Sequence, residues 1–103
     1  MNNIFESIPK NLETEIFEKL VDHDNVRIER IISKGHTSAE DDWYDQEKNE
    51  WVMVLQGEAI LAFVDGRTVT MNVGDYLEIK AHEKHRVQWT SHDTETIWLT
   101  VFY

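Results

Sequence analysis

Cysteine is absent from the 103 residues of this chain, which excludes a disulfide framework, a thiolate metal site and a cysteine nucleophile. A single proline and the lack of low-complexity tracts leave no obvious linker, so we expect one compact unit. No apolar run approaches the roughly 20 residues that cross a bilayer. The first ten residues, MNNIFESIPK, lack the basic and apolar regions of a secretory signal. We therefore expect a cytoplasmic protein with no membrane partner.

Basic residues are also scarce. Ten lysines and arginines stand against twenty acidic residues, and the formal net charge is −10 at pH 7. Nucleic-acid binding depends on clustered lysine and arginine that neutralise phosphates, whereas the densest charge run here, residues 40–50, is acidic. The same charge disfavours an anionic membrane surface. The remaining partners are a small molecule, a cation or another protein.

The first quarter of the sequence predicts a short helix from Asn11 to about Val21. Its apolar residues fall on one helical stripe: Leu12, Ile16, Phe17, Leu20 and Val21. Asn11 can cap this helix, and Asp24-Asn25 would end it. Because so short a helix is marginal alone, we expect residues 1–24 to form a helical segment that packs on the domain formed by residues 25–103.

Beyond residue 25 the sequence predicts an all-β domain. Asp65-Gly66 is a strong two-residue hairpin signal, and Gly57 and Gly74-Asp75 mark further turns. The turns separate about seven short segments of strand character, at the spacing of an antiparallel sandwich or barrel. These segments are residues 25–33, 51–55, 59–64, 67–73, 76–79, 85–90 and 95–103.

Two segments resemble the paired motifs of the cupin family. Glu50, a six-residue spacer and Gly57 are similar to the end of the first motif, and the spacing from Gly74 to His85 follows the second. The resemblance covers residues 25–103 and implies a small single-domain cupin, a double-stranded β-helix or jelly-roll barrel. It also implies a metal site of three histidines and one glutamate, of which Glu50 and His85 match in kind.

Several positions depart from the family pattern. The places of the first motif's histidine pair hold Tyr44 and Gln46 for the shorter spacing, or Trp43 and Asp45 for the longer. In the second motif Lys80 stands in place of proline, His82 in place of glycine and Trp89 in place of asparagine.

Strand alternation predicts that Glu50 and His85 face the barrel interior. Glu50 shares its face with Val52 and Val54, and His85 shares its face with Val87 and Trp89. A buried carboxylate is costly unless it is paired, hydrogen-bonded or bound to a metal.

Two interpretations would each give the Glu50 carboxylate a partner. In the first, Gln46, Glu50 and His85 hold a divalent transition metal, namely Fe, Mn, Ni or Zn. Asp45 is a second possible oxygen donor, and His82, three residues before His85, could supply a second imidazole. In the second, Glu50 and His85 hydrogen-bond to each other, or to Gln46 and Tyr44, inside a closed barrel. Tyr44 and His82 are the candidates for proton transfer in catalysis.

Three functional hypotheses follow. The first is a metal-binding cupin that acts on or binds a small polar metabolite, and the second is a metal-free module that binds a small molecule. The third is an interaction role as a homodimer, in which the aromatic-rich segment 97–103 builds the interface. Trp43 and Tyr44 lie in the acidic loop expected to cross the barrel mouth, where they suit an organic ligand, a plug of the mouth or a dimer contact equally.

Overall fold

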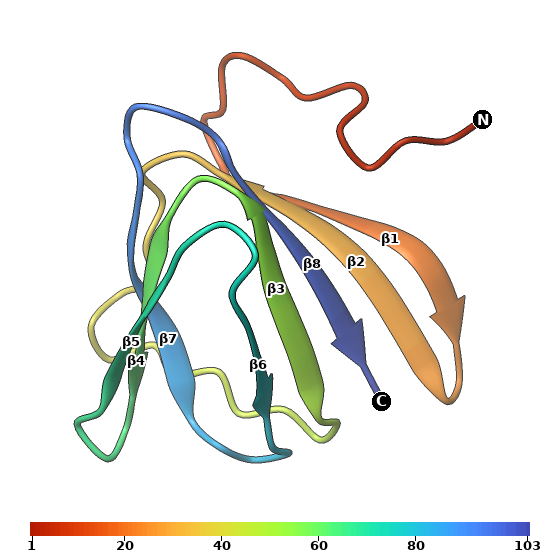
Figure 1. Ribbon diagram of the computed structural model, residues 1–103. Coiled ribbons are helices and arrows are strands. Elements are labelled where there is room, and N and C mark those ends of the chain that lie inside the picture. The colour runs from red at the N-terminus through yellow and green to blue at the C-terminus, as the bar shows by residue number, and fades with distance from the viewer.

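A computed structural model describes all residues from 1 to 103, and they fold into two antiparallel sheets that face each other (Figure 1). One sheet has five strands in the order β1-β2-β8-β3-β6, and the other has three in the order β5-β4-β7. The strands are β1 (Ile16–His23), β2 (Val26–Ser33), β3 (Glu50–Gln56), β4 (Ala59–Phe63), β5 (Thr68–Met71), β6 (Tyr76–Ile79), β7 (His85–Thr90) and β8 (Thr96–Phe102). The predicted jelly-roll barrel is confirmed, and each of the seven segments of predicted strand character contains a strand.

The predicted helix between Asn11 and Val21 is wrong, because the structure has no helix and Ile16–His23 form the edge strand β1. The turn at Asp24-Asn25 joins β1 to β2 in an antiparallel hairpin. A register shift between Lys19 and Val21 leaves Leu20 as an extra residue in β1. This bulge allows apolar residues with helical spacing to occupy a strand, since the side of the sheet on which they lie changes at the bulge.

Long-range pairing explains why the strand forms instead of the helix. Seven residue pairs join β1 to β2, and on one face Ile16 lies opposite Ile32 and Val21 opposite Ile28. Without β1, the outer edge of β2 would expose unpaired backbone groups. An isolated short helix offers no comparable gain, because its stability in a protein comes from packing of its apolar face. The structure contains no helix that could span a membrane.

The N-terminal residues before β1 are tied to the sheet by a buried arginine. Arg30 in β2 is 4% exposed, and its guanidinium donates to the carbonyl oxygens of Ile4 (3.0 Å) and Glu6 (2.6 Å). The same side chain pairs with Glu18 of β1 at 2.7 Å. The outer face of the β1–β2 hairpin is therefore held against the first residues of the chain.

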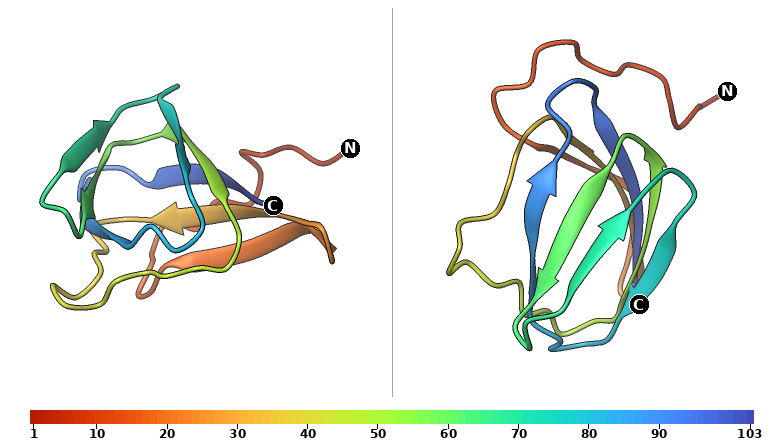
Figure 2. Two further views of the ribbon diagram at one scale, coloured as in Figure 1. Left: turned by 90° about the horizontal axis from the view of Figure 1, so that it is seen from below. Right: turned by 60° about the vertical axis from the view of Figure 1, so that its left-hand side comes forward.

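The two sheets differ in width, and this difference shapes the interior. β1 and β2 extend beyond the three-stranded sheet, so the inner face of this hairpin has no strand opposite it (Figures 1 and 2). The hydrophobic core lies between the three-stranded sheet and strands β8, β3 and β6 of the five-stranded sheet. Its buried members are Val52, Val54, Ala59, Leu61, Phe63, Met71, Ile79, Val87 and Trp98.

Strand β8 lies in the middle of the five-stranded sheet, between β2 and β3. Trp98 and Phe102 are buried there, with 4% and 6% of their surface exposed. The two aromatic side chains within this strand therefore belong to the barrel interior, whereas Leu99 and Val101 are half-buried and Tyr103, just after the strand, is exposed.

Two glycines with positive φ allow a test of how the turns restrict the sequence. Gly57 (φ +86°) lies against Thr96, so that a Cβ atom would overlap the Thr96 side chain and approach its Cα within 2.7 Å. Gly66 (φ +95°), in the β4–β5 hairpin, has nothing within 4 Å of such an atom.

We expect Gly57→Ala to lower the free energy of unfolding by roughly 2–4 kcal/mol, since it adds a steric overlap to the left-handed strain. Gly66→Ala carries only the strain and should lose about 1–2 kcal/mol. Urea denaturation of both variants measures the difference, and equal losses would contradict the packing described at Gly57.

Candidate functional site

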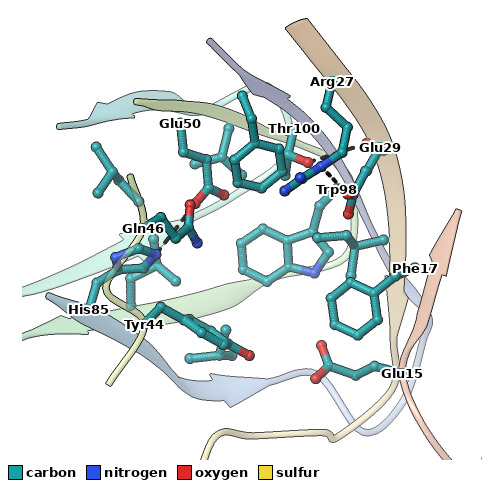
Figure 3. Close-up of a pocket in the computed structure, with 16 residues that line it drawn as sticks. Glu15, Phe17, Arg27, Glu29, Tyr44, Gln46, Glu50, His85, Trp98 and Thr100 are labelled. Atoms are coloured by element: carbon teal, nitrogen blue, oxygen red, sulfur yellow. Dashed lines mark hydrogen bonds and ion pairs between the residues drawn. The ribbon is translucent and has the colours of Figure 1, made fainter. Parts of the chain in front are cut away.

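A cavity of about 240 Å³ lies inside the barrel and opens beneath the β1–β2 hairpin (Figure 3). Nine of its sixteen lining residues are hydrophobic. The lining consists of Glu15, Phe17, Arg27, Glu29, Ile31, Tyr44, Gln46, Glu50, Val52, Leu61, Ile79, His85, Val87, Trp98, Thr100 and Phe102.

Glu50 and His85 come from opposite sheets and meet inside this cavity. Glu50 begins β3 and His85 begins β7, and their exposures are only 7% and 4%. His85 Nε2 lies 3.4 Å from Glu50 Oε1. The inward orientation predicted for Glu50, Val52 and Val54 is confirmed by their burial.

The predicted face of β7 is correct for His85 and Val87 but wrong for Trp89. Leu61 of β4 lies opposite Val87, and the preceding residue Ile60 lies opposite Trp89, so Gln88 is an extra residue in β7. The alternation changes at this bulge, and Thr90 becomes fully buried in place of Trp89.

The hydrogen bonds of His85 determine the charge of the pair. Its Nδ1–H donates to the backbone carbonyl of Glu83 at 2.9 Å, so Nε2 is the nitrogen that faces Glu50. A neutral ring would direct the Nε2 lone pair at the carboxylate, whereas a proton or a metal cation between the two atoms makes the contact attractive. Burial lowers the pKa of His85, but its bonds to Glu50 and to the Glu83 carbonyl outweigh this effect and raise the pKa above its ordinary 6.5.

Gln46 completes the group of predicted metal donors. Its side chain lies beside Glu50 and His85 (Figure 3), and its Oε1 atom is buried without a hydrogen-bond partner. A buried acceptor left without a partner costs about 1–3 kcal/mol. No three histidine, cysteine or acidic side chains are placed to hold a metal, so a metal here would depend on the Gln46 oxygen as its third protein donor.

Tyr44 is the proton-transfer candidate that lines the cavity. Its backbone N–H donates to the His85 carbonyl at 2.7 Å, and the centroids of the two rings lie 5.6 Å apart. Burial raises the pKa of Tyr44 more than its contact with the Ser38 side chain lowers it, and the carboxylates of Glu15, Asp42 and Glu50 raise it further. The phenol therefore keeps its proton at neutral pH.

His82, the second proton-transfer candidate, lies outside the cavity. Its side chain is 66% exposed, and Nδ1 lies 2.8 Å from Oδ1 of Asp45. Its backbone is left-handed (φ +64°), which explains why the resembling motif has glycine at this position. Asp45 therefore contacts His82 on the outside, while Gln46 next to it points inward.

The opposite end of the cavity contains residues that the sequence did not single out. Arg27 and Glu29 lie on β2, with Arg27 Nε 2.6 Å from Glu29 Oε2, and the Arg27 guanidinium covers the Phe102 ring at 4.2 Å. Glu15 and Phe17 come from the region expected to be helical. Strand alternation places Arg27, Glu29 and Ile31 on one face of β2, but the other face carries Ile28 and Ile32, so no sequence signal marked the first face as the inward one.

Trp98 connects the cavity wall to Glu15 through a short hydrogen-bond chain. Trp98 Nε1–H donates to Ser33 Oγ at 3.2 Å, and the Ser33 hydroxyl donates to Glu15 Oε2 at 2.8 Å. Trp43, by contrast, does not line the cavity, and its ring lies 5.5 Å from the Arg86 guanidinium. The two aromatic residues of the loop before β3 thus differ, because only Tyr44 faces the cavity.

Comparison with known proteins agrees with this architecture. The sequence model of the cupin domain matches residues 29–102. A crystal structure from Ralstonia eutropha JMP134, described as a candidate mannose-6-phosphate isomerase, is 39% identical and superposes with a TM-score of 0.94 over 99% of this chain and 95% of that one.

More distant structures share the fold. A cupin superfamily protein from Desulfitobacterium hafniense DCB-2 is 20% identical, with a TM-score of 0.76 over 92% of this chain and 82% of its own. An RmlC-like cupin with a double-stranded β-helix fold, from Methanocaldococcus jannaschii, is 17% identical, with a TM-score of 0.72 over 92% of this chain and 84% of its own. No curated protein shows a significant sequence match to the chain.

The raised pKa of His85 predicts a particular dependence of stability on pH. Because the folded pKa exceeds the unfolded 6.5, the contribution of the pair is complete below pH 6.5 and is lost as the pH rises through the folded pKa. Glu50→Gln removes the charged partner and leaves the burial, so we expect the pKa of His85 to fall. Titration of the His85 ring signals by NMR measures this change.

A matched control uses the exposed pair. Asp45→Asn removes the carboxylate that contacts His82 and should leave the titration of His85 as it is in the wild type. If His85 has the same pKa in the wild type and in Glu50→Gln, the Glu50 carboxylate does not stabilise the proton on the His85 ring.

Proposed function

Since this chain belongs to the cupin family, we propose that it binds a small organic molecule inside the barrel, with a polar group of that molecule at Glu50, His85 and Gln46. The observation that carries the proposal is the buried Gln46 Oε1, which borders the cavity and has no partner in the protein. Buried polar atoms in proteins are nearly always hydrogen-bonded, and a bound ligand supplies the missing contact.

The size and walls of the cavity describe the rest of the ligand. The volume of about 240 Å³ is smaller than the roughly 300–1,000 Å³ of sites for drug-sized molecules. Hydrophobic side chains dominate the lining, and Tyr44 and Trp98 add aromatic surface. A compact metabolite with an apolar body and one polar end fits this combination.

The charges of the cavity favour a ligand without a phosphate group. The name of the Ralstonia relative refers to a sugar phosphate. In this chain the one arginine of the cavity, Arg27, is already paired with Glu29 at 2.6 Å, and the carboxylates of Glu15 and Glu50 also line the space. A phosphate dianion would face these carboxylates with no free arginine or lysine to neutralise it.

We extend the proposal to a divalent metal ion held by Gln46 Oε1, a Glu50 carboxylate oxygen and His85 Nε2. The donor set of one nitrogen and two oxygens suits Fe(II), Mn(II), Ni(II) or Zn(II). The hydrogen bond from Nδ1–H to the Glu83 carbonyl fixes the ring so that Nε2 faces inward, as metal-binding histidines require. A bound metal would supply Lewis-acid polarisation of a ligand oxygen.

The residues of the chain keep their own roles around that ligand. Glu50 accepts a hydrogen bond or binds the metal, and His85 shares a proton with it at Nε2. Tyr44 holds its proton at Oη and can donate it to a ligand acceptor within the cavity. The metal and the Nε2 proton compete for the same nitrogen, so metal affinity should decrease as the pH falls.

The homodimer expected from the sequence remains a proposal, and its interface needs an exposed apolar surface, which segment 97–103 offers at Leu99, Val101 and Tyr103. Exposed apolar side chains of β6 and of the turn before it, Tyr76 at 64% and Val73 at 63%, offer another such surface.

We expect benzyl alcohol, a compact neutral compound with an apolar body, to raise the melting temperature and to shift the Trp98 indole N–H signal in NMR spectra. Ile31→Trp adds volume to a cavity wall and should abolish both effects. Ile28→Trp places the same side chain on the opposite face of β2 and should preserve them. Binding that is unaffected by Ile31→Trp would place the compound outside the cavity.

For the metal, we expect untagged protein incubated with Mn(II), Fe(II), Ni(II) or Zn(II) to retain about one ion per chain after desalting. Glu50→Ala and His85→Ala should abolish metal binding, and Gln46→Ala should lower the affinity for the metal. Elemental analysis measures the retained ion. The double variant His82→Ala/Asp45→Ala removes an exposed imidazole–carboxylate pair and serves as the control, with metal content like that of the wild type. Equal retention in Glu50→Ala would refute the metal site and leave the organic ligand site standing.

A further inference from the structure

The end of the cavity away from Glu50 and His85 has a chemistry of its own. We propose that this end binds an organic cation, an alkylammonium group of the ligand, between the rings of Phe17, Tyr44 and Trp98 and beside the Glu15 carboxylate. This inference rests on the proposed function, because it assigns the second end of the same ligand.

The three rings border one region of the cavity although they come from distant parts of the sequence. Phe17 lies on β1, Trp98 on β8 and Tyr44 in the loop before β3, and their rings lie around the space beside Glu15 (Figure 3). Trp98 is 4% exposed at the base, whereas Phe17 is 56% exposed at the mouth. A ring with more than half of its surface free has a face available to a ligand.

The pairing of the carboxylates leaves one of them without a positive partner. Glu50 faces His85 at 3.4 Å and Glu29 faces Arg27 at 2.6 Å. Glu15 accepts only the hydroxyl of Ser33, at 2.8 Å, and makes no ion pair. The formal net charge of −10 also makes the surroundings attractive to cations.

Aromatic rings together with an unpaired carboxylate are the surroundings that quaternary ammonium groups bind. The faces of tryptophan and tyrosine carry negative potential, which attracts a cation that gives up its water easily. An example already lies in this cavity, where the Arg27 guanidinium covers the Phe102 ring at 4.2 Å. Because Glu29 neutralises Arg27, that side chain does not supply the charge that Glu15 lacks.

Two molecules of the same shape test the proposal. Choline carries a trimethylammonium group, and 3,3-dimethylbutan-1-ol replaces its nitrogen with carbon and has no charge. We expect choline to bind the full-length protein at least about tenfold more tightly, as measured by calorimetry and by the Trp98 indole signal. That signal is sensitive to events at Glu15, because the Ser33 hydroxyl links the indole to the carboxylate.

Variants separate the local site from the general charge of the protein. Glu15→Gln keeps an acceptor for the Ser33 hydroxyl but removes the negative charge. It should lower the affinity for choline about tenfold and leave the affinity for the neutral alcohol unchanged. Phe17→Leu removes an exposed ring without opening the core and should also weaken choline. Glu13→Gln makes the same change of charge at an exposed side chain two residues away and should have no effect.

Four results would overturn the inference. Equal binding of choline and 3,3-dimethylbutan-1-ol would show an apolar site without preference for a cation, and the proposed function would stand. If Glu13→Gln lowers the affinity for choline as much as Glu15→Gln does, choline is attracted by the general negative charge of the protein and not by a local site. If choline fails to bind while benzyl alcohol shifts Trp98, the cation site is refuted and the ligand site stands. If neither binds, the proposed function fails as well.

Discussion

The contact between Glu50 and His85 is the constraint around which the barrel interior is organised. It joins β3 of one sheet to β7 of the other at 3.4 Å, and both side chains are almost completely buried. Removing either partner would leave a buried group without compensation, which is strongly destabilising in proteins. The pair is held from behind by the Glu83 carbonyl, so the imidazole is oriented before any ligand arrives.

This pair also explains why the interior is not packed throughout. Apolar side chains of both sheets fill one part of the barrel, yet the space next to the pair remains a cavity of about 240 Å³ with the unpartnered Gln46 Oε1 on its wall. A cavity and an unpaired polar atom both lower stability. Both costs fall at one place, and the ligand site that we propose would account for them together.

The two ends of the cavity depend on different parts of the fold. The polar end is built by strands that belong to both motifs resembling the cupin family and by Gln46 in the loop before β3. Tyr44 of the same loop lies between the two ends, with its ring 5.6 Å from that of His85 and its hydroxyl toward Glu15 (Figure 3). The mouth is built by the β1–β2 hairpin, of which β1 precedes the matched residues 29–102. The cation preference that we propose therefore depends on Glu15 and Phe17, which precede the matched residues, as well as on Tyr44 and Trp98 within them.

The barrel, its turns and the inward direction of Glu50 and His85 could be predicted from the sequence, because motif spacing and the two-residue period of a strand are local properties. Pairing partners are not local. The helix predicted between Asn11 and Val21 became β1 because β2 offered hydrogen bonds along its edge, and Glu15 and Phe17 entered the cavity with it. The bulge at Gln88 turned Trp89 outward, because the alternation of side chains in β7 depends on how that strand pairs with β4. Which segment lies opposite each strand, and hence which residues border the cavity, depends on pairing between distant parts of the chain and became visible only in the folded barrel.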